Sequence, residues 1–142
     1  MKKLVFLLTI TTSVAFVNAQ KLQTKDVPTS VREAFHKQFS TIKEVKWEKE
    51  HGNYEAGFKL EKTDYSVIVD ASGNILETEM SIDVKSLSAP IIAYIAKNYP
   101  NQKIKEAAKI TDAKGIVTYE AEVNGKDLIF DNNGKFLKET KD

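Results

Sequence analysis

Hydrophobic side chains near the start of the chain recur at every fourth position. They are Val27, Val31, Phe35 and Phe39, with charged and polar residues between them. An apolar stripe at this spacing predicts an amphipathic helix, and Pro28 suits its first turn, where no backbone N–H is needed. The stripe returns 60 residues later as Leu87, Ile91, Ile95 and Tyr99, with Ser88 placed to cap that helix and Pro100 to end it.

Segments in which apolar and polar residues alternate follow each helix. After the first helix they are Val45–Glu48, Tyr54–Glu61, Tyr65–Val69 and Ile75–Glu79, and after the second they are Ile104–Ile110, Val117–Val123 and Leu128–Phe130. A period of two predicts half-buried strands. Glycine-containing stretches such as His51-Gly52-Asn53 and Asn124-Gly125 predict the turns between them.

The order of these elements indicates a duplication. Tyr54-Glu55-Ala56 returns 65 residues later as Tyr119-Glu120-Ala121, and the turn at Asp70 returns 61 residues later at Asp131. The spacing changes at loops, and we interpret this change as a longer hairpin loop in the first copy. The predicted fold is α+β, a tandem duplication of a helix followed by an antiparallel sheet of about four strands, with repeats at residues 20–82 and 83–142. Copies of about 55 residues are expected to pack together or to share one extended sheet.

Residues 1–19 have the pattern of a secretory signal peptide. Lys2 and Lys3 precede an apolar stretch, and Val17-Asn18-Ala19 offers small residues for cleavage, so the mature chain is expected to start at Gln20. A membrane anchor is the alternative, but the apolar stretch is interrupted by Thr and Ser and is shorter than the roughly 20 residues that a span requires. The prediction is an exported protein of the periplasm or the extracellular space, with no membrane insertion after cleavage.

Composition narrows the set of partners. Of the 142 residues, 42% are hydrophobic and 29% are charged, and cysteine is absent, so disulfides and thiolate metal sites are excluded. Two of the 21 basic residues lie in the leader, which leaves 19 against 20 acidic residues. A mature chain so close to neutral is not expected to bind nucleic acid.

The quoted patterns resemble a known family. The leader, the lack of cysteine and two copies of a helix, "V.W…YEAGF" and "D.SGNI" or "DNNGKFL" look like the PepSY-like family of small exported bacterial proteins, over residues 27–140. That family is related in fold to the PepSY domain and to the β-lactamase inhibitor protein. PepSY domains are associated with restraining peptidases, and the inhibitor grips its enzyme with its sheet. The resemblance therefore implies a binding role in the cell envelope. Glu106 stands where the first copy has Trp47, which puts equivalent use of the two sheets in doubt.

Candidate catalytic groups are few. His36 lies on the polar side of a helix and His51 in a turn, and no serine has the surroundings of a nucleophile. Carboxylates could approach one another across strands, but Lys46, Lys49 and Lys59 lie among them, which favours a solvent face with ion pairs over a catalytic cleft. The sequence predicts a protein that is not an enzyme.

Calcium is the one metal that the sequence suggests. Oxygen ligands stand at alternate positions near a glycine, at Asp70, Ser72 and Asn74 and again at Asp131 and Asn133. No glutamate closes either loop at the twelfth position, so the other interpretation is a turn in which Asp accepts backbone N–H groups and Gly adopts positive φ. Some proteins resembling this family have been described as calcium-regulated. A calcium- or small-ligand-binding sensor is therefore the alternative function, and no other cofactor is expected.

The face of the sheet away from the helices is the candidate binding surface. Because side chains alternate, Trp47, Tyr54, Phe58 and Tyr65 should pack under Phe35 and Phe39, which is favoured over a role as a binding platform. The opposite face should be uncovered, and it either meets a protein or peptide partner or is plain solvated surface. The candidate partner-binding residues are Glu48, Glu55, Lys59 and Ile68 in the first copy and Glu120 and Glu122 in the second.

Overall fold

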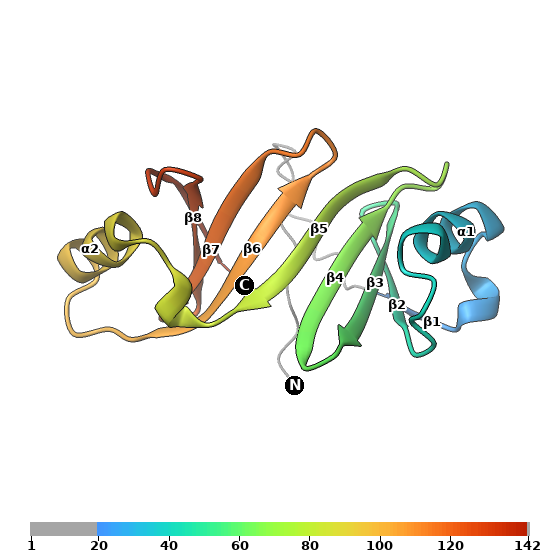
Figure 1. The fold of residues 1–142 in the computed structure, drawn as a ribbon, viewed down its shortest axis with the longest axis horizontal. Coiled ribbons are helices and arrows are strands. Elements are labelled where there is room, and N and C mark those ends of the chain that lie inside the picture. The colour runs from blue at the N-terminus through green and yellow to red at the C-terminus, as the bar shows by residue number, and fades with distance from the viewer. Residues whose placement is uncertain (1–19, 142) are drawn as a thin grey trace. The chain divides into compact units, whose positions relative to one another are not determined.

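A computed structural model describes residues 20–141. The strands are β1 (Gln20–Leu22), β2 (Lys46–Glu50), β3 (Asn53–Leu60), β4 (Thr63–Val69), β5 (Ile75–Ile82), β6 (Ile104–Asp112), β7 (Val117–Val123), β8 (Lys126–Asp131) and β9 (Phe136–Lys141) (Figure 1). The α-helices are α1 (Thr29–Gln38) and α2 (Ala89–Asn98), and the short 3-10 helices η1 (Thr24–Asp26) and η2 (Val84–Ser86) precede them. The predicted signal peptide lies outside the described residues.

The predicted fold class is wrong in its sheets. The nine strands form one antiparallel sheet whose spatial order is their order along the chain, in place of the predicted sheet of about four strands after each helix. With two α-helices among the described residues, the fold is dominated by the sheet. Consecutive pairing satisfies the backbone N–H and C=O groups that the edges of two smaller sheets would leave open. Strand β1 was missed because three residues, Gln20–Leu22, are too few to show an alternating pattern.

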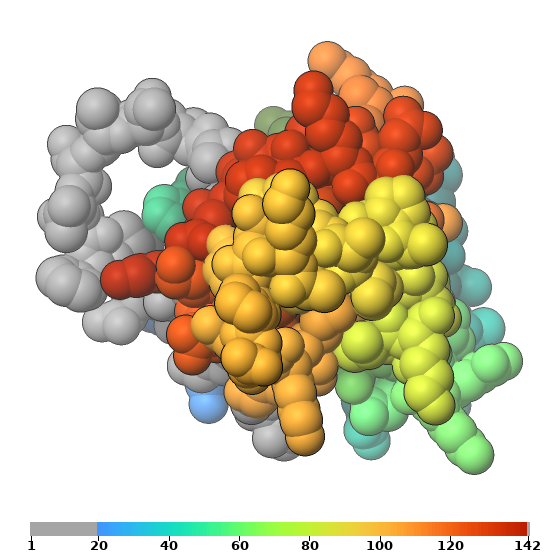
Figure 2. Space-filling view, turned by 90° about the vertical axis from the view of Figure 1, so that its left-hand side faces the viewer, coloured from blue at the N-terminus to red at the C-terminus, as the bar shows by residue number. Residues whose placement is uncertain are grey.

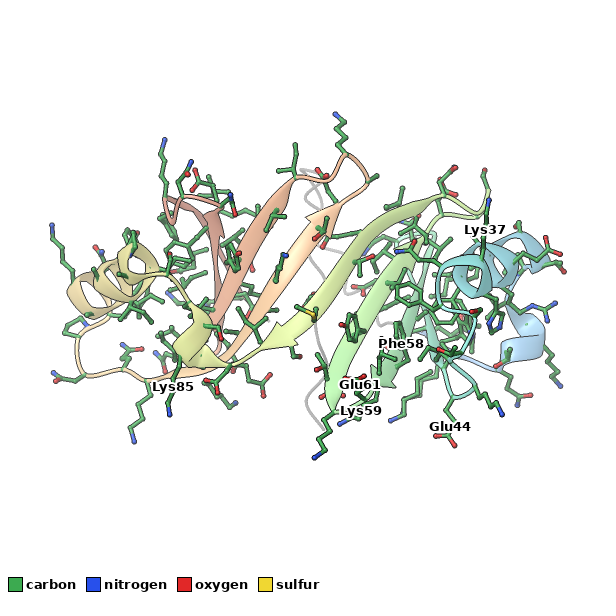
Figure 3. All side chains as sticks on the ribbon, viewed as in Figure 1. Lys37, Glu44, Phe58, Lys59, Glu61 and Lys85 are labelled. Carbon is green, nitrogen blue, oxygen red and sulfur yellow. The ribbon has the colours of Figure 1, made fainter. Side chains whose placement is uncertain are left out.

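The chain divides into two compact units at Thr78 and Glu79, and each has its own core. In the first unit, Val31 and Phe35 of α1 are buried against strands β2 to β4. The centroid of the Phe35 ring is 5.5 Å from that of the Trp47 ring and 5.2 Å from that of the Phe58 ring, and both pairs meet edge to face. Phe58 lies among the side chains between the strands and α1 (Figure 3). The predicted helix stripe and the inward aromatic face of this unit are confirmed.

The second unit repeats the arrangement with smaller residues. Ile91 and Ile95 of α2 are buried with Ala121, Val123, Leu128 and Phe130 of β7 and β8. Tyr94 stacks on Phe136 with ring centroids 4.7 Å apart. The Tyr99 hydroxyl donates to the Glu139 carboxylate, which fastens the end of α2 to β9, and the view onto α2 in Figure 2 shows the C-terminal residues beside it. The predicted second helix stripe is also confirmed.

The two units differ in the length of their hairpin strands. The β3–β4 hairpin closes through Glu61 and Lys62, and the β7–β8 hairpin closes through Asn124 and Gly125, so both loops have two residues. The predicted longer loop in the first copy is therefore wrong. The additional residues extend both strands of the first hairpin, because loop length and strand length change a sequence offset in the same way.

A β-bulge changes the residue that corresponds to Trp47. Trp47 pairs with Ala56 in the first unit, and Ala107 pairs with Ala121 in the second. The register shifts between Ile104 and Glu106, which inserts one residue and exchanges the two faces of β6 before that point. Ala107, and not Glu106, therefore occupies the buried position of Trp47.

Candidate functional site

The candidate site is the helix-free face, defined in each unit as the side of the sheet turned away from its own helix. Glu55 lies on it because its neighbours Tyr54 and Ala56 point into the core. Strand register places the predicted residues on this face in rows. The first unit has the row Lys21, Glu48, Glu55 and Ile68, and the second has the rows Ala108, Glu120, Ile129 and Lys138, and Glu106, Glu122, Asp127 and Thr140.

The helix-free face is more buried than the sequence predicts. Four of its residues expected at an uncovered surface are almost inaccessible, namely Ser66 (3% exposed), Ile68 (5%), Ile129 (6%) and Glu122 (9%). The expectation of an open surface is wrong for these residues. Long side chains on one strand can lie over short ones on the next, and Ser66 is such a case because the Glu55 carboxylate reaches it. Alternation along a strand predicts on which face of the sheet a residue lies. It does not predict whether side chains of the neighbouring strands shield that residue from solvent.

Glu55 and Ser66 form a hydrogen bond diagonally across β3 and β4. The Ser66 hydroxyl donates to Glu55 Oε1 at 2.6 Å. The direct neighbour of Ser66 on β3 is Gly57, which has no side chain and leaves room for the carboxylate. Burial raises the pKa of Glu55, the Ser66 hydrogen bond opposes this shift, and the charges of Glu48 and Glu50 add to it. The site therefore holds a carboxylate that has lost much of its water.

We expect Glu55→Gln to stabilise the protein at neutral pH. Above the raised pKa of Glu55 the folded state carries a charge that burial disfavours, while well below 4.5 the carboxyl is protonated in both the folded and the unfolded state. Each unit of such a shift corresponds to about 1.4 kcal/mol. Melting temperatures should show a gain of a few degrees at pH 7 that disappears at acid pH. A loss of stability at pH 7 would contradict the assigned desolvation. Lys59→Gln, at an exposed position, should change little at either pH.

The second unit has three carboxylates in one row of the helix-free face. Glu106 is opposite Glu122, and Glu122 is opposite Asp127. Lys105, the bulge residue, donates from Nζ to Glu122 Oε1 at 3.2 Å. Glu106 was missed as a candidate because its alignment with Glu122 depends on the bulge. Asp127 was missed because the predicted strand Leu128–Phe130 begins one residue after it, whereas β8 begins at Lys126. Correct placement of the bulge would have found Glu106, and a longer predicted strand would have found Asp127.

Lys59 is the one exposed residue among the six predicted partner-binding residues. It is opposite Asp64 on β4, and Lys59 Nζ lies 3.1 Å from Asp64 Oδ1. Figure 3 shows Lys59 and Glu61 near the end of the hairpin. An ion pair this open to solvent contributes about 0–1 kcal/mol. Lys59 is therefore available to a partner at little cost.

The candidate calcium ligands lie in turns with one repeated hydrogen-bond pattern. Asp70 Oδ1 accepts from the backbone N–H groups of Ser72 and Asn74, both at 2.9 Å. Asp131 Oδ1 accepts in the same way from Asn133 and Lys135. A third turn repeats the pattern from Asp112 to Lys114 and Ile116, although it lacks oxygen-bearing side chains at those two positions. The side chains of Ser72, Asn74 and Asn133 are therefore not required for the turn itself.

The carboxylates of Asp70 and Asp131 already accept hydrogen bonds from backbone N–H groups of their own turns. Hydrogen bonds from the Asn74 side chain and backbone, and from the Ser72 and Gly73 backbone, lower the pKa of Asp70. This contribution to the turn is present at neutral pH and is lost as the pH falls through the lowered pKa. Within residues 20–141, no group of three or more His, Asp or Glu side chains is gathered closely enough to hold a metal.

Comparison with known proteins places the chain in a family. The model of the family described as "Putative beta-lactamase-inhibitor-like, PepSY-like" matches twice, at residues 15–77 and 63–138. The chain belongs to this PepSY-like family. No curated protein sequence matches it. Among the helices of the described residues, none has the length and apolar character to cross a membrane.

Solved structures from Bacteroides species share the fold. A "putative periplasmic" protein from Bacteroides eggerthii superposes with a TM-score of 0.73 at 15% identity, covering 80% of this chain and 88% of that one. A DUF2874 family protein from Bacteroides ovatus gives 0.71 at 18% identity, covering 81% and 88%. A "BLIP-like" protein from Bacteroides fragilis gives 0.64 at 22% identity, covering 80% and 85%. At these identities the likeness is one of fold alone.

Proposed function

We propose that the protein is a non-catalytic binding module of the cell envelope that engages a protein or peptide through its helix-free face. The observation that carries the proposal is the pairing of carboxylates across strands on that face. Glu48 is directly opposite Glu55, and Glu122 lies between Glu106 and Asp127. Like charges directly opposite each other destabilise a sheet. Carboxylates outnumber lysines in both places, because Lys21 is opposite Glu48 in a row that also holds Glu55, and Lys105 contacts only Glu122 of the three acids in the row of the second unit. A partner that brings positive charge would offset this cost on binding.

The surroundings of these carboxylates support the same proposal. Desolvation raises the pKa of Glu55, and Glu122 is 9% exposed, so neither acid has the full hydration of a surface carboxylate. A charge that has already lost water gives up less on meeting a partner, and its Coulomb interaction there is less screened. In the first unit the half-buried Glu48 and the exposed Lys59 lie on the same face as Glu55, and in the second unit the half-buried Glu120 lies on the same face as Glu122.

Family and fold likeness agree with this role and with export. The Bacteroides fragilis neighbour is described as BLIP-like and the Bacteroides eggerthii neighbour as a putative periplasmic protein. The predicted leader at residues 1–19 supports export of this chain as well. A periplasmic or extracellular location is part of the proposal, and the identity of the partner is to be found by experiment.

Capture of partners from the envelope of the producing cells tests the proposed face. We expect Glu48→Lys and Glu120→Lys to reduce the recovery of a crosslinked partner several-fold, because each reverses a charge on the helix-free face. Glu33→Lys is the matched control, since it makes the same charge change at an exposed position of α1. Melting temperatures of all variants establish that they are folded. Equal recovery with all three would remove the helix-free face from the proposal.

Titration with calcium distinguishes the alternative function, a calcium or small-ligand sensor, from the proposed binding module. If the binding-module proposal is correct, millimolar calcium should produce no heat and no shift in melting temperature. Binding that is abolished by Asp70→Ala and Asp131→Ala, but kept in Asp112→Ala, would favour the sensor. The Asp112 variant is the matched control because its turn has the same backbone hydrogen bonds without the alternating oxygen ligands.

A further inference from the structure

Strand β1 starts at the residue that the leader pattern makes the mature N-terminus. Cleavage after Ala19 would free the α-amino group of Gln20, the first residue of β1. Gln20 is exposed and pairs with Lys49 of β2. The new chain end would therefore lie in a paired strand, with the Gln20 side chain accessible to solvent.

Lys49 is the charged residue directly opposite this chain end, and its neighbours Glu48 and Glu50 project from the other face of β2. An α-amino group has a pKa of about 7.7–8.0 and is largely cationic at neutral pH. Register aligns Gln20 with Lys49, Tyr54 and Val69, a row without a carboxylate. Lys49 Nζ lies 5.4 Å from the centroid of the Tyr54 ring. A cationic terminus at Gln20 thus opposes a lysine across the strands, and like charges in that position are destabilising.

We propose that Gln20 of the mature protein is a modification site at which the chain end cyclises to pyroglutamate. The unprotonated α-amino nitrogen attacks Cδ of the Gln20 side chain, an N–Cδ bond forms, the Cδ–Nε2 bond breaks, and Nε2 takes up a proton and leaves as ammonia. The product is a five-membered lactam, and no oxidant or further reactant is consumed. Residue 20 keeps one N–H and its carbonyl, so β1 can remain paired with β2, while the positive charge opposite Lys49 is removed.

Mass spectrometry of the exported protein tests the proposal. The full chain, expressed with its leader and recovered from the envelope fraction, should have the mass of residues 20–142 less one ammonia. Sequential N-terminal degradation should be blocked, and pyroglutamyl aminopeptidase should remove one residue and expose Lys21. A chain that starts at Gln20 with its ammonia retained, or one that starts at another residue, would overturn the proposal.

Two variants connect the modification to the side chain and to the charge. Gln20→Ala should yield a chain with a free amino group that degrades normally, and a blocked terminus in this variant would contradict cyclisation. Newly cleaved and cyclised forms of the wild-type chain should differ in melting temperature, with the cyclised form higher. This difference should shrink in Lys49→Gln, and an unchanged difference would remove the charge argument. These readouts require no partner, so they are independent of the proposed binding function.

Discussion

Gly73→Ala and Gly134→Ala are expected to destabilise their units strongly. Both glycines have left-handed backbone, with φ of 88° and 82°, which costs a side-chain-bearing residue about 1–2 kcal/mol. A Cβ at Gly73 would lie 2.8 Å from the Ser30 carbonyl oxygen, and one at Gly134 would lie 2.8 Å from Pro90 Cβ. Overpacking of this kind adds about 1–3 kcal/mol. Urea unfolding should therefore show a loss of about 2–5 kcal/mol for each variant.

Gly115→Ala is the matched control for these two substitutions. Gly115 occupies the same turn position with φ of 79°, but a Cβ there would meet nothing within 4 Å. Its loss should be only the backbone cost of about 1–2 kcal/mol. The difference between the turns arises because those at Gly73 and Gly134 lie against the first turns of α1 and α2, where Ser30 Oγ also donates to the Ala71 carbonyl at 3.0 Å. Equal losses at all three glycines would show that this contact contributes little.

Phe35→Ala is expected to be the most damaging substitution in the core of the first unit. Phe35 is fully buried and contacts the rings of Phe39, Trp47 and Phe58. Removing a buried phenylalanine ring costs about 3–5 kcal/mol, through lost burial and the cavity that remains. Trp47 is the single tryptophan of the chain, so its fluorescence reports on this core directly. We expect a lower urea midpoint and a shift of the emission to longer wavelength.

Phe39→Ala tests whether the loss of stability in Phe35→Ala is due to the burial of that ring, because both variants remove a phenylalanine. Phe39 follows α1 and contacts the rings of Phe35 and Phe58, but it is only half-buried. Part of its surface already faces solvent, so its removal should cost less than that of Phe35. If the two variants lose equal stability, the position of α1 on the sheet is not the one described.

Local periodicity made the helices and the inward face of the strands predictable. An apolar residue every three or four positions identifies a helix from its own sequence, and the stripes that begin at Val27 and Leu87 pack into the two cores, with their last members Phe39 and Tyr99 partly buried. Alternation likewise placed Tyr54 and Ala56 in one core and Tyr119 and Ala121 in the other. Each of these features depends on neighbours within one element, which is why sequence was sufficient.

Features that depend on pairing between strands were not predictable in this way. The nine-stranded order, the three-residue strand at Gln20 and the bulge near Glu106 arise from backbone hydrogen bonds between distant residues. Backbone groups are the same for almost every residue type, so a sequence pattern carries little information about their partners. The predicted correspondence of Glu106 with Trp47 failed for this reason.

The twin segments Tyr54-Glu55-Ala56 and Tyr119-Glu120-Ala121 separate what the sequence determines from what the tertiary structure decides. The sequence by itself determined that tyrosine and alanine point into a core and that one carboxylate per segment points away, because alternation is a property of a single strand. Tertiary structure alone decided that Glu55 lies beside Ser66 over the space left by Gly57 and loses its water there. The neighbouring strand determines the burial and the hydrogen bonding of Glu55. The register in which that strand pairs cannot be predicted from the sequence of the segment alone.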